Sequence, residues 1–211
     1  MMDTRVWIGY GYELLTVMLP SVAVLLLYNA GNKRRNAPLR PRCLVWMIVF
    51  LFYLYGVFHF TGAGTVFDAK RYGLEWNPGR VNMLPFSDAD FDPVGYVLNI
   101  FLFIPLGFLL PFIWQRFYPL KSVLFAGLSF SALIEISQLL NSRSTDVDDI
   151  ILNTAGALAG AVLFRFLSRF RMVRPVHCQN GWAAYAAIFF SFLCRFFLYD
   201  EMGLAKILYG F

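Results

Sequence analysis

The chain has 211 residues, of which 59% are apolar and only 15% are charged, and it contains 23 phenylalanines. A water-soluble domain of this size cannot bury so much apolar surface in one core, whereas lipid solvates it. The formal net charge of +5 is compatible with a nucleic-acid partner or with the basic loops of a membrane protein, and the distribution of the charges decides between them.

Six apolar segments follow one another along the chain, at residues 11–28, 43–60, 95–114, 122–140, 150–167 and 182–199. Each approaches the roughly 20 mostly apolar residues that a helix needs to cross a bilayer. Only Arg5 precedes the first segment, whereas the basic run 33–35 follows it, the reverse of a cleaved secretory signal. We therefore predict an all-α, polytopic transmembrane helical bundle of about six spans, beginning with an uncleaved anchor.

Basic residues gather in alternate loops. Segments 33–42, 115–121 and 165–174 hold 11 of the 18 Lys and Arg residues and no Asp or Glu. The opposite segments, 1–10, 61–93, 141–149 and 200–211, hold 11 of the 13 acids. Basic loops stay in the cytoplasm, so both termini are expected outside. The excess positive charge is then explained by the orientation of the helices in the membrane and by contact with anionic lipids, and no nucleic-acid partner is expected.

The segments divide the chain into three parts. Residues 1–42 are expected to form an N-terminal anchor helix and a basic cytoplasmic loop, 43–174 the membrane core, and 175–211 a last transmembrane helix with a short outer tail. The short cytoplasmic loops leave no room for a soluble catalytic domain. Any chemistry is therefore expected within the membrane or at its outer surface.

Several residues are interpreted as structural. Cys43, Cys178 and Cys194 show no disulfide or metal-ligand spacing, so small buried thiols are expected, with no metal site and no cofactor. Glu13 is expected to mark the outer interface. Arg195 is expected to extend outward to the acids of the final tail.

Polar side chains inside the apolar segments need a reason, because a charge at the bilayer centre costs about 2.5–3.5 kcal/mol. Glu135 lies within the fourth segment, and Gln138 follows it on nearly the same helical face. Asn99 and Asn153 lie near the outer ends of the third and fifth segments. All four lie at comparable depth, so they are candidates for one pocket. The alternative is a hydrogen-bond network that only holds the helices together.

The start of the fifth segment has the most informative spacing. Asp146, Asp149, Asn153 and Gly156 are 3, 4 and 3 residues apart, which places them on one stripe of a helix. Asp148 is expected to point elsewhere. Acids in a first helical turn also complement the positive end of the helix dipole.

Neighbouring residues are expected to shape this pocket. Arg143, in loop 141–149, is the natural counter-charge for the acids around it. Pro105 removes a backbone hydrogen bond from the third segment and Gly107 follows it, so a kink is expected there. Gly156 and Gly160 form a small-xxx-small surface that lets another helix approach closely.

Four short motifs occur in order: Asn-x-x-Pro-Phe at 82–86, Asn-x-x-x-Phe-x-Pro-x-Gly at 99–107, Glu-x-x-Gln at 135–138 and Asp-x-x-Asp-x-x-x-Asn-x-x-Gly at 146–156. Together they resemble the VanZ-like family, named for a protein associated with teicoplanin resistance, over about residues 44–168. The resemblance implies a multi-pass protein of the bacterial cytoplasmic membrane. Some members are linked to reduced glycopeptide susceptibility.

The leading hypothesis is a binding protein that contributes to glycopeptide resistance or cell-envelope homeostasis. It would engage a lipid-linked cell-wall precursor or a glycopeptide at the outer membrane face. The motifs and the pocket together give the candidate ligand-binding residues Asn82, Pro85, Phe86, Asn99, Glu135, Gln138, Arg143, Asp146, Asp149 and Asn153.

Two alternatives stay open. In the first, the chain is an intramembrane enzyme that modifies an envelope lipid, with Glu135 as general acid or base and Asp146 and Asp149 recruiting a divalent cation. In the second, it transports a lipid or small molecule. The polar residues cluster towards one face and no internal repeat is evident, which ranks transport last.

Overall fold

The computed structural model describes residues 4–34, 36, 38–73, 81–86, 93–141 and 145–210. Its elements in chain order are α1 (Thr4–Arg34), α2 (Pro41–Thr61), α3 (Val66–Tyr72), β1 (Val81–Asn82), α4 (Pro93–Ile113), the 3-10 helix η2 (Gln115–Phe117), α5 (Leu120–Gln138), β2 (Thr145–Asp146), α6 (Val147–Arg169), α7 (Trp182–Leu198) and α8 (Glu201–Tyr209). Among the described residues, five helices (α1, α2, α4, α5 and α6) are long and apolar enough to cross a membrane. Helices α7 and α8, bent by 41°, form a sixth candidate span. The predicted all-α bundle of about six spans is confirmed.

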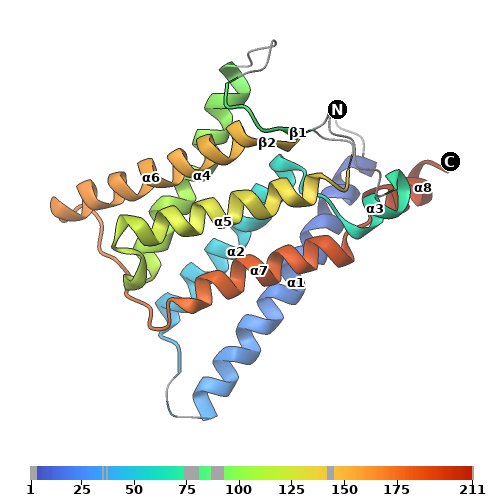
Figure 1. The fold of residues 1–211 in the computed structure, drawn as a ribbon. Coiled ribbons are helices and arrows are strands. Elements are labelled where there is room, and N and C mark those ends of the chain that lie inside the picture. Colours follow the sequence, from blue (N-terminus) through green and yellow to red (C-terminus); the bar gives the residue numbers. More distant parts are fainter. Residues whose placement is uncertain are drawn as a thin grey trace.

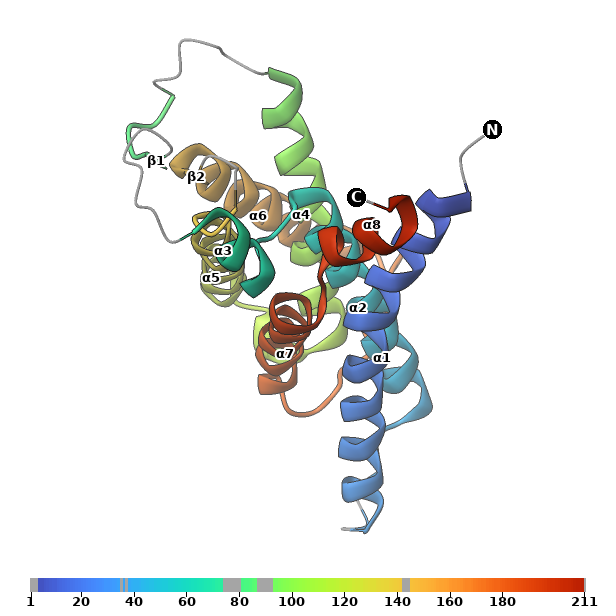
Figure 2. The same ribbon diagram turned by 90° about the vertical axis from the view of Figure 1, so that its right-hand side faces the viewer.

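The helices form two groups that pack side by side (Figures 1 and 2). Helix α4 packs mainly on α6, and α6 also packs on α5, whereas α1 packs on α2 and α7. Contacts of α2 with α4 join the groups. Helix α1 begins and α8 ends at the same end of the bundle, which also carries α3 and the β1–β2 pair (Figure 1). We call this the terminal end.

Local sequence signals define the helix ends nearest to the candidate pocket. Helix α2, which has Pro41 in the first turn at its far end, ends at Thr61 and is capped by Gly62, whose φ of 60° is left-handed. Helix α3 begins with a capping box in which Thr65 and Asp68 bond each other's backbone N–H groups. Helix α6 begins at Asp146, whose side chain accepts from the Asp148 backbone N–H at 2.9 Å. The polar ends of these helices are thus hydrogen-bonded.

Glycines bring α4 and α6 into backbone contact. A β-carbon added to Gly107 would lie 1.7 Å from the Ala157 carbonyl oxygen. One added to Gly156 would lie 2.2 Å from the carbonyl oxygen of Ile100, on α4. Gly160 makes an equally close approach one turn further along α6. Such spacing requires glycine, and it sets the distance between two walls of the candidate site.

The expectation of three unpaired thiols was wrong for two of them. Cys43, at the start of α2, and Cys178, just before α7, form a disulfide with a Cα–Cα distance of 5.7 Å. The residues are 135 positions apart, so local spacing gives no sign of the bond. The Cys178 backbone N–H donates to the Ile113 carbonyl at 2.7 Å, which docks this segment on the end of α4. Cys194 is a buried free thiol, as expected.

Candidate ligand-binding site

A cavity of about 480 Å³ lies among α4, α5 and α6, beside the end of α2. Five of the polar residues expected to form a pocket line it: Asn99, Glu135, Gln138, Asp149 and Asn153. The rest of the wall is largely apolar and includes Phe60, Leu98, Phe101 and Leu102. The cavity therefore combines a polar region with a surface suited to hydrocarbon.

Amide contacts join α6 to both α4 and α5 at the cavity. Asn99 donates a hydrogen bond from Nδ2 to Oδ1 of Asp149. One turn further along α6, Asn153 donates from Nδ2 to Ser131 Oγ of α5 at 2.9 Å. Asn153 is only 2% exposed, and its Oδ1 has no hydrogen-bond partner. A residue of the cavity wall therefore carries an acceptor that the protein leaves unpaired.

The α5 side of the cavity presents Glu135 and Gln138. The Glu135 carboxylate, 2% exposed, accepts from the Asp146 backbone N–H at 3.1 Å. Gln138 donates from Nε2 to the Thr61 carbonyl at 2.8 Å, and its Oε1 is buried without a partner. Buried polar atoms are almost always hydrogen-bonded, so unpaired acceptors on two residues that line the same cavity call for an explanation.

The turn after α2 is held against the end of α5 by further contacts. Gly64 donates from its backbone N–H to Ser137 Oγ at 2.9 Å, and Asn141 donates from Nδ2 to the Gly62 carbonyl at 3.1 Å. A β-carbon on Gly64 would lie 1.9 Å from the Ser137 carbonyl oxygen, so only glycine allows this approach. These contacts fix the wall of the cavity near Gln138.

Asp146 contributes to the site mainly through its backbone. Its side chain caps α6, and its backbone N–H contacts Glu135. Asn82 pairs with Asp146 in the parallel β1–β2 ladder, and its Oδ1 accepts from the Leu84 backbone N–H at 3.1 Å. Neither residue lines the cavity. Both position the first turn of α6, from which Asp149 reaches the cavity.

The other motif residues lie outside the cavity wall. Pro85 and Phe86 are exposed and form a turn, and Phe86 has a φ of 54°. Arg143, the expected counter-charge, lies outside the described residues.

Asp148 has a role that the sequence analysis did not assign. It is fully buried, does not line the cavity and contacts the turn at 82–86. Its carboxylate accepts from the Phe86 backbone N–H at 2.9 and 3.1 Å and from Tyr96 Oη at 2.6 Å. Asp148 thereby fastens the Asn-x-x-Pro-Phe element to α6. The sequence does contain one sign of such a role, because three acids lie within four residues at 146–149 and they cannot all share one face of a helix.

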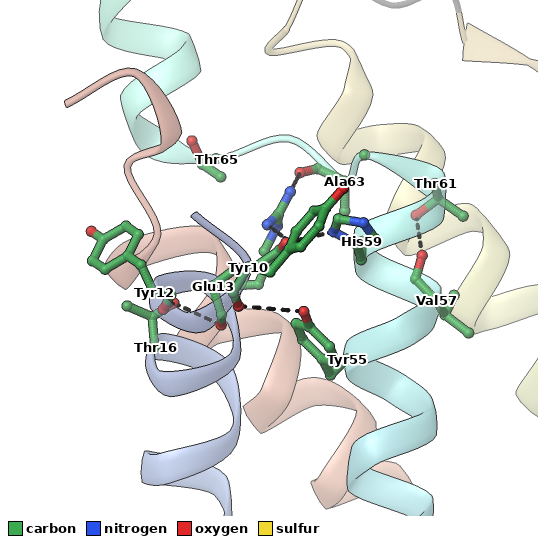
Figure 3. Close-up of polar contacts among 12 residues, drawn as sticks. Tyr10, Tyr12, Glu13, Thr16, Tyr55, Val57, His59, Thr61, Ala63 and Thr65 are labelled. Atoms are coloured by element: carbon green, nitrogen blue, oxygen red, sulfur yellow. Dashed lines mark hydrogen bonds and ion pairs between the residues drawn. The ribbon is translucent and has the colours of Figure 1, made fainter. Parts of the chain in front are cut away.

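A second polar cluster lies at the terminal end, among α1, α2 and α7 (Figure 3). Glu13 forms an ion pair with Arg195 through Oε1, and His59 Nδ1 lies 2.6 Å from its Oε2. Arg195 also donates to the Ala63 carbonyl at 3.4 Å. Arg195 is only 4% exposed, so the expectation that it extends outward was wrong. The reason is the buried carboxylate of Glu13, which was expected at the interface and instead pairs with the Arg195 guanidinium inside the bundle.

The fold and site define a polytopic helical membrane protein with a polar cavity between three of its spans. The family model of VanZ/LLP1 matches residues 42–168, which is more than half of the chain. The chain belongs to the VanZ/LLP1 family. The match covers α4 and α5 in full and all but one end residue of α2 and of α6, and therefore the whole cavity wall, whereas α1, α7 and α8 lie outside it. No curated protein and no solved structure matches the chain.

Proposed function

We propose that the cavity binds the polar group of an amphiphilic component of the bacterial envelope, at the outer face of the cytoplasmic membrane. The observation that carries the proposal is the pair of unpaired acceptors, Gln138 Oε1 and Asn153 Oδ1, on two residues that line a cavity also lined by Glu135 and Asp149. A buried acceptor without a partner costs about 1–3 kcal/mol. A bound ligand that donates hydrogen bonds recovers this cost.

The apolar part of the cavity wall favours an amphiphilic ligand over a fully polar one. Phe60 and Phe101 are 72% and 63% exposed, so both face the surroundings of the bundle as well as the cavity. In a bilayer these surroundings are lipid chains. A polar group in the cavity can therefore remain attached to a hydrocarbon chain that stays in the membrane.

Membership of the family connects this binding to glycopeptide resistance. The candidate ligands are a lipid-linked cell-wall precursor and an acylated glycopeptide of the teicoplanin type. Binding either one at the outer face would shield the drug target or withdraw the drug from it. Resistance then follows from sequestration and requires no change in covalent structure.

The test compares Gln138→Ala with Gln179→Ala. Gln138 lines the cavity, whereas Gln179 is exposed and lies just before α7. Each full-length variant is expressed in a teicoplanin-susceptible bacterium, and its membrane level is measured together with the drug susceptibility of the cells. We expect Gln138→Ala to lose the protection that wild type and Gln179→Ala confer. Equal protection by all three proteins at equal levels would refute the proposed role of the cavity.

An intramembrane enzyme is the second candidate, because Glu135 and Asp149 line one cavity. Asp146 supports this reading less, since its carboxylate caps α6. Glu135→Gln separates the two functions. An enzyme would lose its product, detected by mass spectrometry of envelope lipids, whereas a binding protein would leave the covalent structures of those lipids unchanged.

A further inference from the structure

We propose that the end of the bundle opposite the terminal end holds a membrane phospholipid with a net negative headgroup. An acyl chain of this lipid enters an apolar pocket among α1, α2 and α7, and its phosphate enters an adjoining polar pocket. Among the described residues, none lines both this site and the cavity among α4, α5 and α6. The inference therefore goes beyond the proposed function and does not depend on it.

The apolar pocket has a volume of about 320 Å³ and lies among three helices. Helix α7 contributes the small side chains of Ala183, Ala186 and Ala187 to its wall. These leave space beside Phe50 and Leu51 of α2. Such a wall removes hydrocarbon from water without offering a polar ligand any partner, so it is suited to an acyl chain.

The polar groups of this wall also fit a lipid. Ser21 donates its hydroxyl to the Val17 carbonyl at 2.7 Å and lies 3.1 Å from the Ser191 hydroxyl, so its hydrogen bonds are made within the protein. Trp114 lines the pocket and is fully buried, and its Nε1 has no partner among the described residues. An indole nitrogen can only donate a hydrogen bond. The ester groups of a phospholipid supply acceptors and no donors, which is the kind of atom that Trp114 lacks.

The apolar pocket adjoins a polar pocket of about 400 Å³. Tyr28 and Asn180 line both pockets, and Asn180 donates from Nδ2 to Tyr28 Oη at 3.1 Å. The Tyr28 hydroxyl keeps its own hydrogen for another acceptor. Helix α1 ends and α2 begins at this end of the bundle (Figures 1 and 2). The polar pocket therefore lies where headgroups lie when these helices span a bilayer.

The polar pocket has a positive side chain and no acid to compensate it. Arg40 and His177 line it, and among the described residues no Asp or Glu lines either pocket. The sequence around it, at 29–43 and 170–182, contains no acid either. A phosphate accepts charge-assisted hydrogen bonds from a guanidinium, and these are roughly twice as strong as neutral ones. A zwitterionic headgroup would bring an ammonium group into the same space, so the pocket favours a lipid with net negative charge.

The two segments that form the polar pocket are held together by the protein itself. The Leu39 backbone N–H donates to Asn29 Oδ1 at 3.0 Å, which ties the residue before Arg40 to α1. The Cys43–Cys178 disulfide joins the start of α2 to the segment before α7. The groups that contact the phosphate are therefore in place before a lipid binds, which distinguishes this site from diffuse contact between basic loops and anionic lipid.

The experiment uses the purified full-length chain and two lipids with identical acyl chains, dioleoyl phosphatidylglycerol, which is anionic, and dioleoyl phosphatidylcholine, which is zwitterionic. Native mass spectrometry during titration gives the apparent Kd of each lipid. We expect saturable binding of phosphatidylglycerol that is at least about tenfold tighter than that of phosphatidylcholine, because hydrogen bonds to charged groups are the strong ones. Arg40→Gln should bring the two affinities together.

Matched controls separate the two pockets from the rest of the surface. Arg169→Gln removes the same charge at an exposed position of α6 that lines neither pocket, so it should keep the preference. Ala186→Phe fills part of the apolar pocket from an exposed position of α7, so it should weaken the binding of both lipids. Ala159→Phe adds the same side chain at an exposed position of α6 outside both pockets and should bind as wild type does.

Three results would overturn the proposal. Equal affinity of the wild type for both lipids, or binding that does not saturate, would refute a selective site. Equal loss of phosphatidylglycerol affinity in Arg40→Gln and Arg169→Gln would show that the contact is diffuse. Unchanged affinity in Ala186→Phe would show that the acyl chain does not enter the pocket among α1, α2 and α7.

Discussion

Gln138, at the end of α5, donates a hydrogen bond to the backbone carbonyl of Thr61, at the end of α2, over 2.8 Å. The two residues are 77 positions apart in the sequence. The amide oxygen of Gln138, a residue that lines the cavity, is buried without a hydrogen-bond partner. A single side chain therefore joins the ends of α2 and α5 at the cavity and retains one unpaired acceptor.

The close approach of α4 and α6 predicts that Gly156→Ala destabilises the protein. The added methyl group would lie 2.2 Å from the Ile100 carbonyl oxygen, so the helices must separate. Overpacking of this kind costs about 1–3 kcal/mol. Gly56→Ala is the control, because nothing lies within 4 Å of its added β-carbon. Thermal unfolding in detergent should show a lower Tm for Gly156→Ala and an unchanged or higher Tm for Gly56→Ala; the same shift in both would argue against the packing described.

The Glu13–Arg195 ion pair predicts that substitutions of the two residues have non-additive effects on the free energy of unfolding. Arg195→Met leaves the buried Glu13 carboxylate without its guanidinium partner, at a cost of about 3–5 kcal/mol. Adding Glu13→Gln removes the uncompensated charge, so the double variant should recover most of the lost stability. Arg174→Met, at an exposed position, should have little effect. Additive losses in the Glu13 and Arg195 single and double variants would show that the two side chains do not interact.

The Cys43–Cys178 bond predicts a stability that depends on reductant. Cross-linking residues this far apart contributes about 2–4 kcal/mol. The bond lies near the basic loops, which are expected in the cytoplasm, where disulfides are rare, so the measurement uses purified protein under oxidising conditions. Dithiothreitol should lower the Tm of the wild type and leave a Cys43→Ser/Cys178→Ser variant unchanged. Reaction of both cysteines with maleimide in unfolded, unreduced protein would contradict the bond.

The contacts of Asp148 predict local loosening when its carboxylate is removed. In Asp148→Ala the Phe86 backbone N–H and the Tyr96 hydroxyl lose their acceptor, and the turn at 82–86 loses its hydrogen bonds to this side chain of α6. Hydrogen exchange at Phe86 should accelerate by at least about tenfold, which corresponds to roughly 1.4 kcal/mol. Tyr96→Phe should have a smaller effect, because it removes only one of the donors. Unchanged exchange at Phe86 in Asp148→Ala would show that the turn is held by other contacts.

Periodic signals in the sequence were sufficient to predict the spans and much of the cavity. The spacing from Asp149 to Asn153 places both on one face of α6, and the same argument brings Glu135 and Gln138 together on α5. Their depths in adjacent segments then predict a shared pocket, and the structure shows that all four line one cavity. These relations depend on regular helices, which is why the sequence reveals them.

Contacts between distant segments were not predictable in this way. The partners of Arg195 and Cys43 lie 182 and 135 residues away, and no periodicity relates such positions. The hydrogen-bond partners of Asp148 could not be predicted either, because they depend on where the turn at 82–86 packs against α6. Tertiary packing, which a single sequence does not display, decides each of these contacts.

The most direct test of the cavity is an inventory of the molecules that remain bound during gentle purification. Native mass spectrometry is applied to full-length wild type, Gln138→Ala, Asn153→Ala and the control Gln179→Ala, all extracted in the same detergent. A binding site at the unpaired acceptors predicts an amphiphile retained by wild type and the control and depleted from both cavity variants. The same bound molecules in equal amounts on all four folded proteins would contradict it.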